Sequence, residues 1–302
     1  HRLKFLDNID TMKHFILLFL LILSPIHIIA QKDNSIEYAD LLIKKGVDAL
    51  YKKDHTHSLE IFAELKTLAE KNNWYNQQFI ATNCIGLNYY GMADYSEALD
   101  YYLEAYTIAM KHLTKDNEKT VLNNIALVYF EQGKYKESEK HQKRAYELAL
   151  DNKDSVGIAI YADNLANLYN KTNQLDKALE YIKIAKPMAL ATKEKRSVID
   201  IAISEAQNYL QRKDFDKTLS ILQPIINQLN TQDQNDNKIE ALLILSKVFQ
   251  GKNDYQKALT YAIEAQKTNE NYPNKKKIYN QFSNLYFESK DYEKAFRYKD
   301  SI

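Results

Sequence analysis

Two rows of small residues recur every forty residues, and this spacing constrains the fold more than any other feature of the sequence. An aromatic or aliphatic side chain stands three residues after each member of the first row and three residues before each member of the second. The first row is Gly86, Ala126, Ala166, Ala206 and Ser246, followed by Tyr89, Tyr129, Tyr169, Tyr209 and Phe249; the second is Ala98, Ser138, Ala178, Thr218 and Ala258. Both rows extend back to Gly46 and Ser58 and, after a step of thirty-seven, on to Ser283 and Ala295. A fixed period of this length indicates an array of stacked units.

Within each unit, apolar residues recur three and four residues apart, which predicts two amphipathic helices joined by a short polar turn. In the third unit we expect them at about 118–131 and 135–150, with a turn at 132–134; in the fourth unit we expect the turn at 172–174. Two helices pack about 8–10 Å apart only where one side of the contact is small, which explains the two rows. The recurring Tyr or Phe is expected to fill the space against the next unit. The sequence therefore predicts an all-α fold.

The composition fits an all-α chain and excludes several classes of function. Six Gly and four Pro in 302 residues are too few for a turn-rich protein. Lys plus Arg number 41 against 40 Asp plus Glu, which leaves no electrostatic footprint for nucleic acid or an anionic membrane. The single cysteine, Cys84, cannot form an intramolecular disulfide. It falls in an expected first helix, where a small packing residue is favoured over a nucleophile.

The N-terminal segment is typical of an exported protein. Met12 and Lys13 precede a nine-residue apolar run at 15–23, and the small residue Ala30 stands before a polar stretch that begins at Gln31. This layout predicts a signal peptide at 12–30, with 1–11 upstream of the start and 31–38 as a linker. An uncleaved membrane anchor is the alternative, although the apolar stretch is short for a span of about 20 residues. We therefore expect an exported chain that is periplasmic or membrane-associated on the periplasmic side.

The paired rows resemble the motif of the tetratricopeptide repeat: a small residue, a Tyr three residues later, a turn, an aromatic residue and an Ala three residues after that. It is read in Gly86-x-x-Tyr89 with Tyr95-x-x-Ala98, in Ala126-x-x-Tyr129 with Tyr135-x-x-Ser138, and in Ala166-x-x-Tyr169 with Leu175-x-x-Ala178. The resemblance covers about 39–302 and implies a right-handed α-α superhelical solenoid of about seven helix pairs, the last incomplete. The units are expected near 39–78, 79–118, 119–158, 159–198, 199–238, 239–275 and 276–302.

Some features depart from the family pattern. The period is forty instead of the usual 34, and the six extra residues are expected between a second helix and the next first helix, which implies longer helices. The first unit has Lys45 at an apolar position and His55 in place of Tyr, which suits a capping unit with one face in solvent. The fifth unit has Glu205 where its neighbours carry Ile or Leu, and Pro224 within its second helix. A proline there is expected to kink the helix, and we expect the lowest local stability in this unit.

In the family the first helices line an inner groove that binds peptides, and the resemblance implies groove residues in this chain. The candidates are Asn83, Leu87, Tyr90, Asn123, Asn124, Leu127, Asp163, Asn164, Asn167 and Asn170. An amide both donates and accepts, so Asn124 and Asn164 could hold the backbone of an extended peptide; alternatively, such amides serve neighbouring helices. The family's carboxylate clamp requires Lys and Arg where this chain has Asn123, Leu127, Asp163 and Ser204. A C-terminal acidic tail is therefore not the expected ligand.

No motif in the sequence indicates catalysis, a metal or a cofactor. A Gly-rich phosphate loop, an H-E-x-x-H helix, a G-x-S-x-G elbow and a paired-carboxylate motif are all missing from the sequence. His55 and His57 lie two apart on a helix and do not face each other, so we expect no metal there. The chain is expected to be a non-catalytic protein.

The sequence stops at Ile302 inside a second helix, from which we expect further chain or a partner to follow. Exported helical arrays of this kind resemble the sensor half of bacterial membrane-bound regulators. The functional hypothesis is a protein- or peptide-binding scaffold of the bacterial envelope, acting as the input module of a larger signalling protein. A structural or assembly factor with permanent protein contacts is the alternative. No nucleic acid is expected as a partner. We expect contact with a membrane only through a missing C-terminal span or an uncleaved signal.

Overall fold

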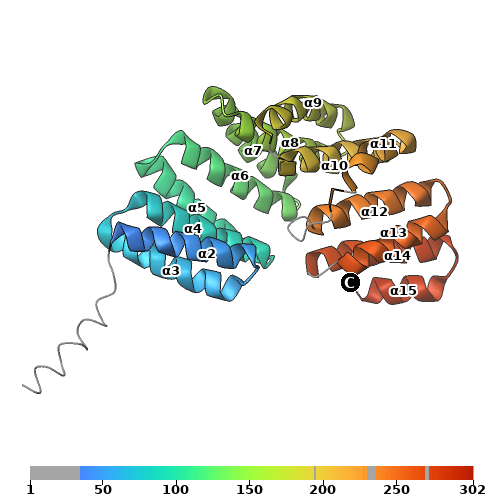
Figure 1. The fold of residues 1–302 in the computed structure, drawn as a ribbon, viewed down its shortest axis with the longest axis horizontal. Helices are drawn as coiled ribbons and strands as arrows, with labels where there is room; N and C mark the ends of the chain where they lie inside the picture. Colours follow the sequence, from blue (N-terminus) through green and yellow to red (C-terminus); the bar gives the residue numbers. More distant parts are fainter. Residues whose placement is uncertain (1–34, 194, 227, 230–234, 269–271, 302) are drawn as a thin grey trace, which may run out of the picture. The chain divides into compact units, whose positions relative to one another are not determined.

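The chain folds into a succession of α-helices. The computed structural model describes residues 35–193, 195–226, 228–229, 235–268 and 272–301. Within these ranges it contains fourteen helices and no β-strand (Figure 1). The expected signal peptide at 12–30 and the segment before it lie outside the described residues. None of the described helices is long and apolar enough to cross a membrane.

The helices form seven pairs, as the repeat predicts, and the all-α fold class is confirmed. The pairs are α2 (Ile36–Tyr51) with α3 (His55–Asn72), α4 (Tyr75–Gly91) with α5 (Tyr95–His112), α6 (Lys115–Glu131) with α7 (Tyr135–Asp151), α8 (Ser155–Lys171) with α9 (Leu175–Thr192), α10 (Lys195–Gln211) with α11 (Phe215–Ile226), α12 (Asn235–Gly251) with α13 (Tyr255–Thr268), and α14 (Tyr272–Glu288) with α15 (Tyr292–Asp300). The described residues divide into two compact units, one up to Ala81 and one from Thr82 on, and the candidate site lies wholly in the second.

The forty-residue step consists almost entirely of helix. In the fourth pair, α8 has seventeen residues and α9 has eighteen, a three-residue turn joins them, and only residues 193–194 lead to α10. The extra residues relative to a 34-residue repeat therefore lengthen the helices, as expected, and the connection between pairs is shorter than expected. The expected unit boundaries near 79, 119, 159, 199, 239 and 276 each fall four residues after the start of a first helix.

Each turn inside a pair has one residue with a left-handed backbone conformation. This residue immediately precedes the N-cap residue of the second helix. These residues are Lys53, Ala93, Gly133, Asn173, Lys213, Asn253 and Lys290, with φ between 58° and 73°. An Asp follows in most pairs, and its carboxylate accepts a backbone N–H of the second helix: Asp54, Asp94, Asp214, Asp254 and Asp291. These caps satisfy helix N–H groups that have no partner within the helix. The expected turns at 132–134 and 172–174 are confirmed.

The two rows of small residues face each other within each pair. Their members lie twelve residues apart, and where one is Ser its hydroxyl donates to the backbone carbonyl of the other: 2.8 Å for Ser138 to Ala126 and 2.8 Å for Ser246 to Ala258. The same bond joins Ser58 to Gly46 and Ser283 to Ala295. A hydroxyl on Cβ reaches a backbone carbonyl only where the two helices are in close contact. The small residues therefore set the distance between the helices, as the sequence predicts.

Glycine appears in the first row where a large ring must be accommodated. A Cβ added to Gly86 would lie 2.6 Å from Cε1 of Tyr102, and one added to Gly46 would lie 2.7 Å from Cζ of Phe62. Both rings stand sixteen residues after the glycine and are almost completely buried. In the fourth pair the corresponding residues are Ala166 and Ile182, so a larger first-row residue accompanies a smaller partner. In these pairs the two positions complement each other in volume.

The recurring aromatic residues stack mainly within their own pair. The ring of Tyr129 lies 5.5 Å from that of His141, and the ring of Tyr169 lies 5.6 Å from that of Tyr181, both in stacked orientation. The hydroxyl of Tyr169 donates to Glu139 of the preceding pair at 2.7 Å. Another recurring aromatic residue, Tyr135 of the third pair, packs against the buried cluster of the fourth pair, as expected for rings that fill the space against the next unit.

The atypical residues of the first and fifth pairs have local explanations. Lys45 is exposed, as a solvent-facing position in a capping unit would be. Glu205 is mostly buried, but its carboxylate forms an ion pair with Lys186 of the preceding helix pair, at 2.7 Å. Helix α11 ends at Ile226, two residues after Pro224, and with twelve residues it is shorter than α9. A second proline, Pro187, lies inside α9, which has eighteen residues.

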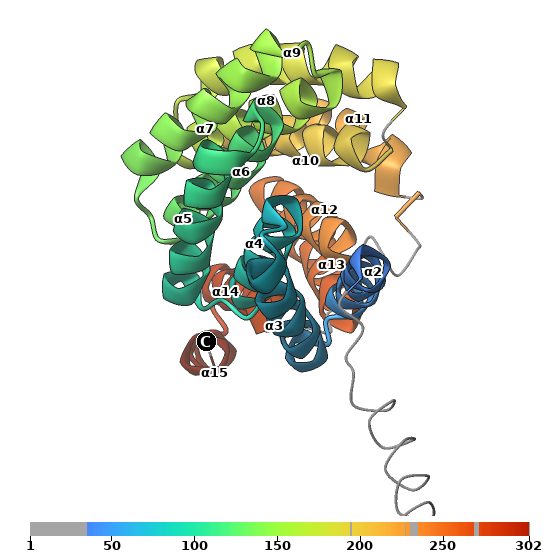
Figure 2. The same ribbon diagram turned by 90° about the vertical axis from the view of Figure 1, so that its left-hand side faces the viewer.

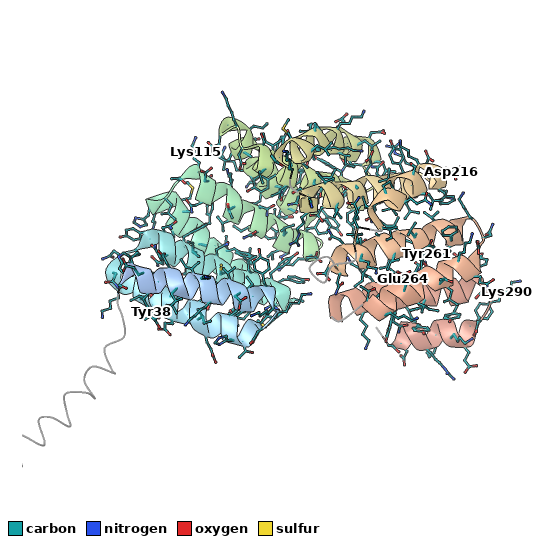
Figure 3. All side chains as sticks on the ribbon, viewed as in Figure 1. Tyr38, Lys115, Asp216, Tyr261, Glu264 and Lys290 are labelled. Carbon is teal, nitrogen blue, oxygen red and sulfur yellow. The ribbon has the colours of Figure 1, made fainter. Side chains whose placement is uncertain are left out.

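Exposed ion pairs also link successive pairs of helices. Asp176 pairs with Arg212 at 2.6 Å, and Asp216, labelled in Figure 3, pairs with Lys252 at 2.7 Å. In both cases the Asp starts a second helix and its partner lies in the turn thirty-six residues later. Because both carboxylates are largely exposed, each pair contributes little to stability, about 0–1 kcal/mol.

We expect Gly86→Ala to destabilise the protein. The new Cβ would overlap the buried ring of Tyr102, which cannot move away without displacing its neighbours. The loss should be about 1–3 kcal/mol, larger than the gain in helix propensity of roughly 1 kcal/mol. The measurement is thermal unfolding followed by circular dichroism.

The matched control is the double variant Gly86→Ala with Tyr102→Ile, which reproduces the Ala166 and Ile182 combination. It should recover much of the lost stability. A single variant that melts at the same temperature as the wild type would contradict the packing argument.

Candidate functional site

A cavity of about 700 Å³ opens along the first helices of the second unit. Figure 2 shows α8 and α10 on the inner side of α9, and the cavity lies on this inner side. Five first helices and the start of α7 contribute to it. The lining residues are Leu127, Phe130, Glu131, Ser138, Gln142, Ala159, Ile160, Asp163, Asn164, Asn167, Asn170, Lys171, Ser197, Asp200, Ile201, Ile203, Ser204, Gln207, Asp236, Asn237, Glu240, Leu243, Lys247, Lys277, Asn280, Gln281 and Asn284.

The lining residues occupy the same few positions in each first helix. In α8 these include Ile160, Asp163, Asn164 and Asn167, whose spacing of three, four and seven residues places them on one helix face. The positions recur forty residues later as Asp200, Ile203, Ser204 and Gln207, and again in α12 and α14. The repeat therefore brings one face of five helices together into a single surface.

Half of the groove residues expected from the sequence line this cavity. Leu127, Asp163, Asn164, Asn167 and Asn170 do so; Asn83, Leu87, Tyr90, Asn123 and Asn124 are not among its lining residues. No groove residue was expected beyond the fourth unit, although the cavity continues into the seventh. Continuing the repeat register from Asp163 and Asn167 reaches six further lining residues: Ile203, Gln207, Leu243, Lys247, Asn280 and Asn284.

Side-chain amides bridge successive first helices, and most of the expected Asn residues take part. Asn164 donates to Asn123 at 2.7 Å, and Asn124 donates to Asn83 at 2.9 Å. The bridge continues from Asn208 to Asn170 at 2.7 Å. A polar ladder thus runs along the stacked first helices. The sequence left two roles for these amides, binding of a peptide backbone and bonding to neighbouring helices. The bonded amides of the ladder have the second role.

The ladder leaves a few amides of the cavity without a bond to any described residue. Gln207, Asn280 and Asn284 line the cavity, and no hydrogen bond joins their side chains to another described residue. Gln281, by contrast, donates to Ser246 at 3.0 Å and to Gln250 at 2.8 Å. Since each unbonded amide offers both a donor and an acceptor, these three side chains can bind a polar ligand backbone.

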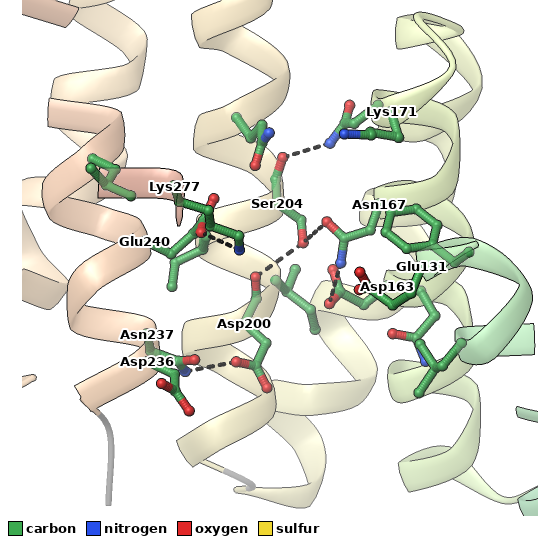
Figure 4. Close-up of a pocket in the computed structure, with 18 of the residues that line it drawn as sticks. Glu131, Asp163, Asn167, Lys171, Asp200, Ser204, Asp236, Asn237, Glu240 and Lys277 are labelled. Carbon is green, nitrogen blue, oxygen red and sulfur yellow. Dashed lines mark hydrogen bonds and ion pairs between the residues drawn. The ribbon is translucent and has the colours of Figure 1, made fainter. Parts of the chain in front are cut away.

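Asp163 is the most perturbed ionisable group of the cavity. Its side chain is about 6% exposed; Oδ2 accepts a bond from Asn167 at 3.3 Å, and Oδ1 has no hydrogen-bond partner in the described structure (Figure 4). The pKa of this carboxyl is raised to about 7, chiefly by burial and in smaller part by the nearby charge of Asp200, while the Ser204 hydroxyl acts to lower it. Near neutral pH, the site holds a carboxyl group that is neither fully solvated nor fully bonded.

Other charged groups surround it. Burial raises the pKa of Asp200, which accepts a bond from Asn237 at 2.7 Å. Lys277 pairs with Glu240 at 3.0 Å, and the charges of Glu240, Glu131 and Asp236 raise the pKa of its ammonium. The cavity is thus a charged and amide-rich surface with apolar side chains such as Leu127 and Ile160 between the polar groups.

Two other reactive side chains of the described residues, Cys84 and His57, are not among the cavity-lining residues. Burial raises the pKa of the Cys84 thiol to about 12, so it stays protonated and fits the packing role. Among the described residues, no group of three or more His, Cys, Asp or Glu side chains could hold a metal ion. The other candidate, His57, lies beside a carboxylate of its own helix: its Nδ1 is 3.7 Å from Oε2 of Glu60.

We expect Asp163→Asn to stabilise the protein at neutral and alkaline pH. The folded-state pKa lies above the unfolded value, so the folded protein binds the extra proton, and stability falls as the pH rises from about 4 to about 7. Asn does not titrate, so the stability advantage of the variant should grow over this range by about 4 kcal/mol, since each unit of pKa shift corresponds to about 1.4 kcal/mol. Thermal unfolding at pH 4, 6 and 8 measures it.

The control Asp100→Asn removes an exposed carboxylate from α5 and should show no such growth. If the difference in stability between Asp163→Asn and the wild type stays constant from pH 4 to pH 8, the raised pKa of Asp163 is contradicted.

Comparisons with known proteins agree with this architecture. A family model described as tetratricopeptide repeat matches residues 118–189, which include α7 and α8. A comparison with curated proteins gave no match.

Solved structures of helical-repeat proteins share the fold. The apo form of RapI has a TM-score of 0.66 and 18% identity over 82% of this chain and 89% of its own. NprR in complex with its cognate peptide NprX has a TM-score of 0.64 and 14% identity over 87% and 76%. A tetratricopeptide repeat protein from Parabacteroides merdae has a TM-score of 0.56 and 16% identity over 88% and 92%. The tetratricopeptide repeat model thus matches residues 118–189, and the chain shares the helical-repeat fold of these solved structures.

Proposed function

We propose that this chain is a non-catalytic scaffold that binds an extended peptide segment in the cavity of its first helices. The observation that carries the proposal is the set of unbonded amides that line this cavity, Gln207, Asn280 and Asn284. They come from two different first helices, α10 and α14. An extended backbone offers an N–H or C=O at each residue, which such amides can bind without selecting a sequence.

The apolar part of the cavity supports the same ligand class. Ile160 is about 39% exposed although it lines the cavity, and Leu127 lies on the neighbouring helix α6. An extended peptide places alternate side chains on opposite sides, so it can bury one apolar side chain here while its backbone meets the amides. A cavity of about 700 Å³ is large enough for a few residues of such a segment.

The fold comparison adds support. NprR, a protein of similar fold, is known in complex with its cognate peptide NprX. At 14% identity the likeness concerns the fold, and the site residues of this chain must carry the proposal themselves.

The place of action is a further part of the proposal. We infer that the chain is exported to the bacterial envelope and serves there as the input module of a signalling protein. The support is the signal-peptide pattern at 12–30, with Ala30 before Gln31, and the absence of a catalytic motif in the sequence.

Selection from a library of random displayed peptides should yield ligands that bind the full chain with micromolar affinity. The double variant Gln207→Ala with Asn284→Ala should weaken their binding roughly thirtyfold, because it removes two hydrogen bonds that are each worth about 1 kcal/mol. Fluorescence anisotropy with the selected peptides measures the affinity, and the melting temperature should stay unchanged.

The matched control removes two exposed amides from second helices, Gln223→Ala with Gln256→Ala. Peptides that bind all three proteins equally would place the binding surface elsewhere. A selection that enriches no peptide would argue against peptide binding altogether.

Expression of the chain from Met12 in a Gram-negative host should give a periplasmic product that starts at Gln31. A signal peptidase cleaves after a small residue such as Ala30. Intact-mass measurement of the osmotic-shock fraction gives the new N-terminus. A full-length product that sediments with the membranes would favour the uncleaved anchor instead.

A further inference from the structure

The charges that line the cavity are not balanced. Five carboxylates contribute to it, Glu131, Asp163, Asp200, Asp236 and Glu240, against the three lysines Lys171, Lys247 and Lys277. The whole chain, by contrast, carries 41 basic against 40 acidic residues. The excess of negative charge is therefore a local property of the cavity, and low-dielectric walls strengthen its field.

The carboxylates are also unevenly placed. Figure 4 shows Asp200 and Asp236 at one end of the close-up and Lys171 at the opposite end. Asp163 belongs with the carboxylates, because the charge of Asp200 acts on it. We call Asp163, Asp200 and Asp236 the acidic end of the cavity; they come from three successive first helices, α8, α10 and α12.

Asp163 shows that the acidic end is incompletely bonded. Its side chain is more than nine-tenths buried and lines the cavity, yet Oδ1 accepts no hydrogen bond from the described residues. A buried acceptor without a partner destabilises a protein, and the penalty is greater for a charged group. The torsion between Cβ and Cγ of Asp is soft, so either oxygen can turn toward the cavity. A donor that enters the cavity would satisfy this group.

We propose that the acidic end binds a cationic nitrogen of the peptide, either its free N-terminal ammonium or the side chain of a lysine or arginine. This inference rests on the proposed function. A cation supplies several N–H donors and a positive charge at once, so it would satisfy the free oxygen of Asp163 and offset the repulsion from Asp200. An amide or hydroxyl would supply the hydrogen bond but not the charge. Selectivity for cationic peptides follows from that difference.

An array of heptapeptides of random sequence, printed with free and with acetylated N-termini, tests the proposal against the full chain. Lysine and arginine should be enriched over glutamate and aspartate among the bound peptides, or acetylation should abolish binding; the two arms distinguish a side chain from the terminal amine. Replacement of the cationic residue by glutamine in a bound peptide should weaken its affinity about tenfold or more.

Variants of the chain locate the effect. Asp163→Asn with Asp200→Asn should abolish the preference for cationic peptides. The control Asp176→Asn with Asp216→Asn makes the same two side-chain replacements at exposed positions on second helices and should keep the preference. The single variant Asp163→Asn removes a buried charge without changing side-chain size, and it tests the site if the double variant does not fold.

The outcomes separate this inference from the function on which it rests. Peptides that bind the cavity with no preference for cationic groups would overturn the inference and leave the peptide-binding scaffold intact. A preference that survives in Asp163→Asn with Asp200→Asn would overturn it as well. If the chain binds no peptide at all, both this inference and the proposed peptide-binding function are contradicted.

Discussion

The close contact between the two small residues of each helix pair is the constraint on which the rest of the structure depends. Ser138 and Ser246 reach the backbone carbonyls of Ala126 and Ala258 directly, so no larger side chain fits between those helices. Because every pair repeats this contact with the same spacing, every first helix presents the same face in the same register. The cavity follows from that register. Its lining recurs at fixed positions from α8 to α14 and requires no specialised loop.

The polar ladder shows how one residue type can have two roles on the same repeated helix face. Asn164 donates to Asn123 and so joins two successive first helices, whereas Asn284, on the same repeated face, has no bond to a described residue. A bonded amide inside a stack of helices satisfies its neighbour, and breaking the bond leaves a buried polar group unpaired. An unbonded amide at the cavity surface is satisfied by water and can exchange it for a ligand. Position relative to the adjacent helix, not residue type, decides the role.

The sequence predicts the fold almost completely, because the period, the small residues and the turns at 132–134 and 172–174 are local signals that every unit repeats. It predicts the site only in part. Asp163 and Asn167 were identified, and the register extends to Gln207 and Asn284 by simple addition of the step. The pairing of Asn124 with Asn83, the burial of Asp163 and the stacking of Tyr169 on Tyr181 were not predicted, because they depend on side-chain volumes of helices that are distant in sequence.

Asp163 is best understood as a conflict between stability and binding. In the helix pairs before and after it, the equivalent positions hold Asn123 and Ile203, so the repeat itself does not require a carboxyl group there. A buried carboxyl with an unbonded oxygen destabilises the folded chain near neutral pH, where Asn or Ile would not. In an array, each unit contacts only its neighbours, so the penalty stays local and the other pairs can sustain the fold. Sequences break their own local rules chiefly where a function compensates. A group that is poorly satisfied in the free protein interacts most favourably with a ligand that satisfies it, so the residue that weakens the fold is the one expected to strengthen binding.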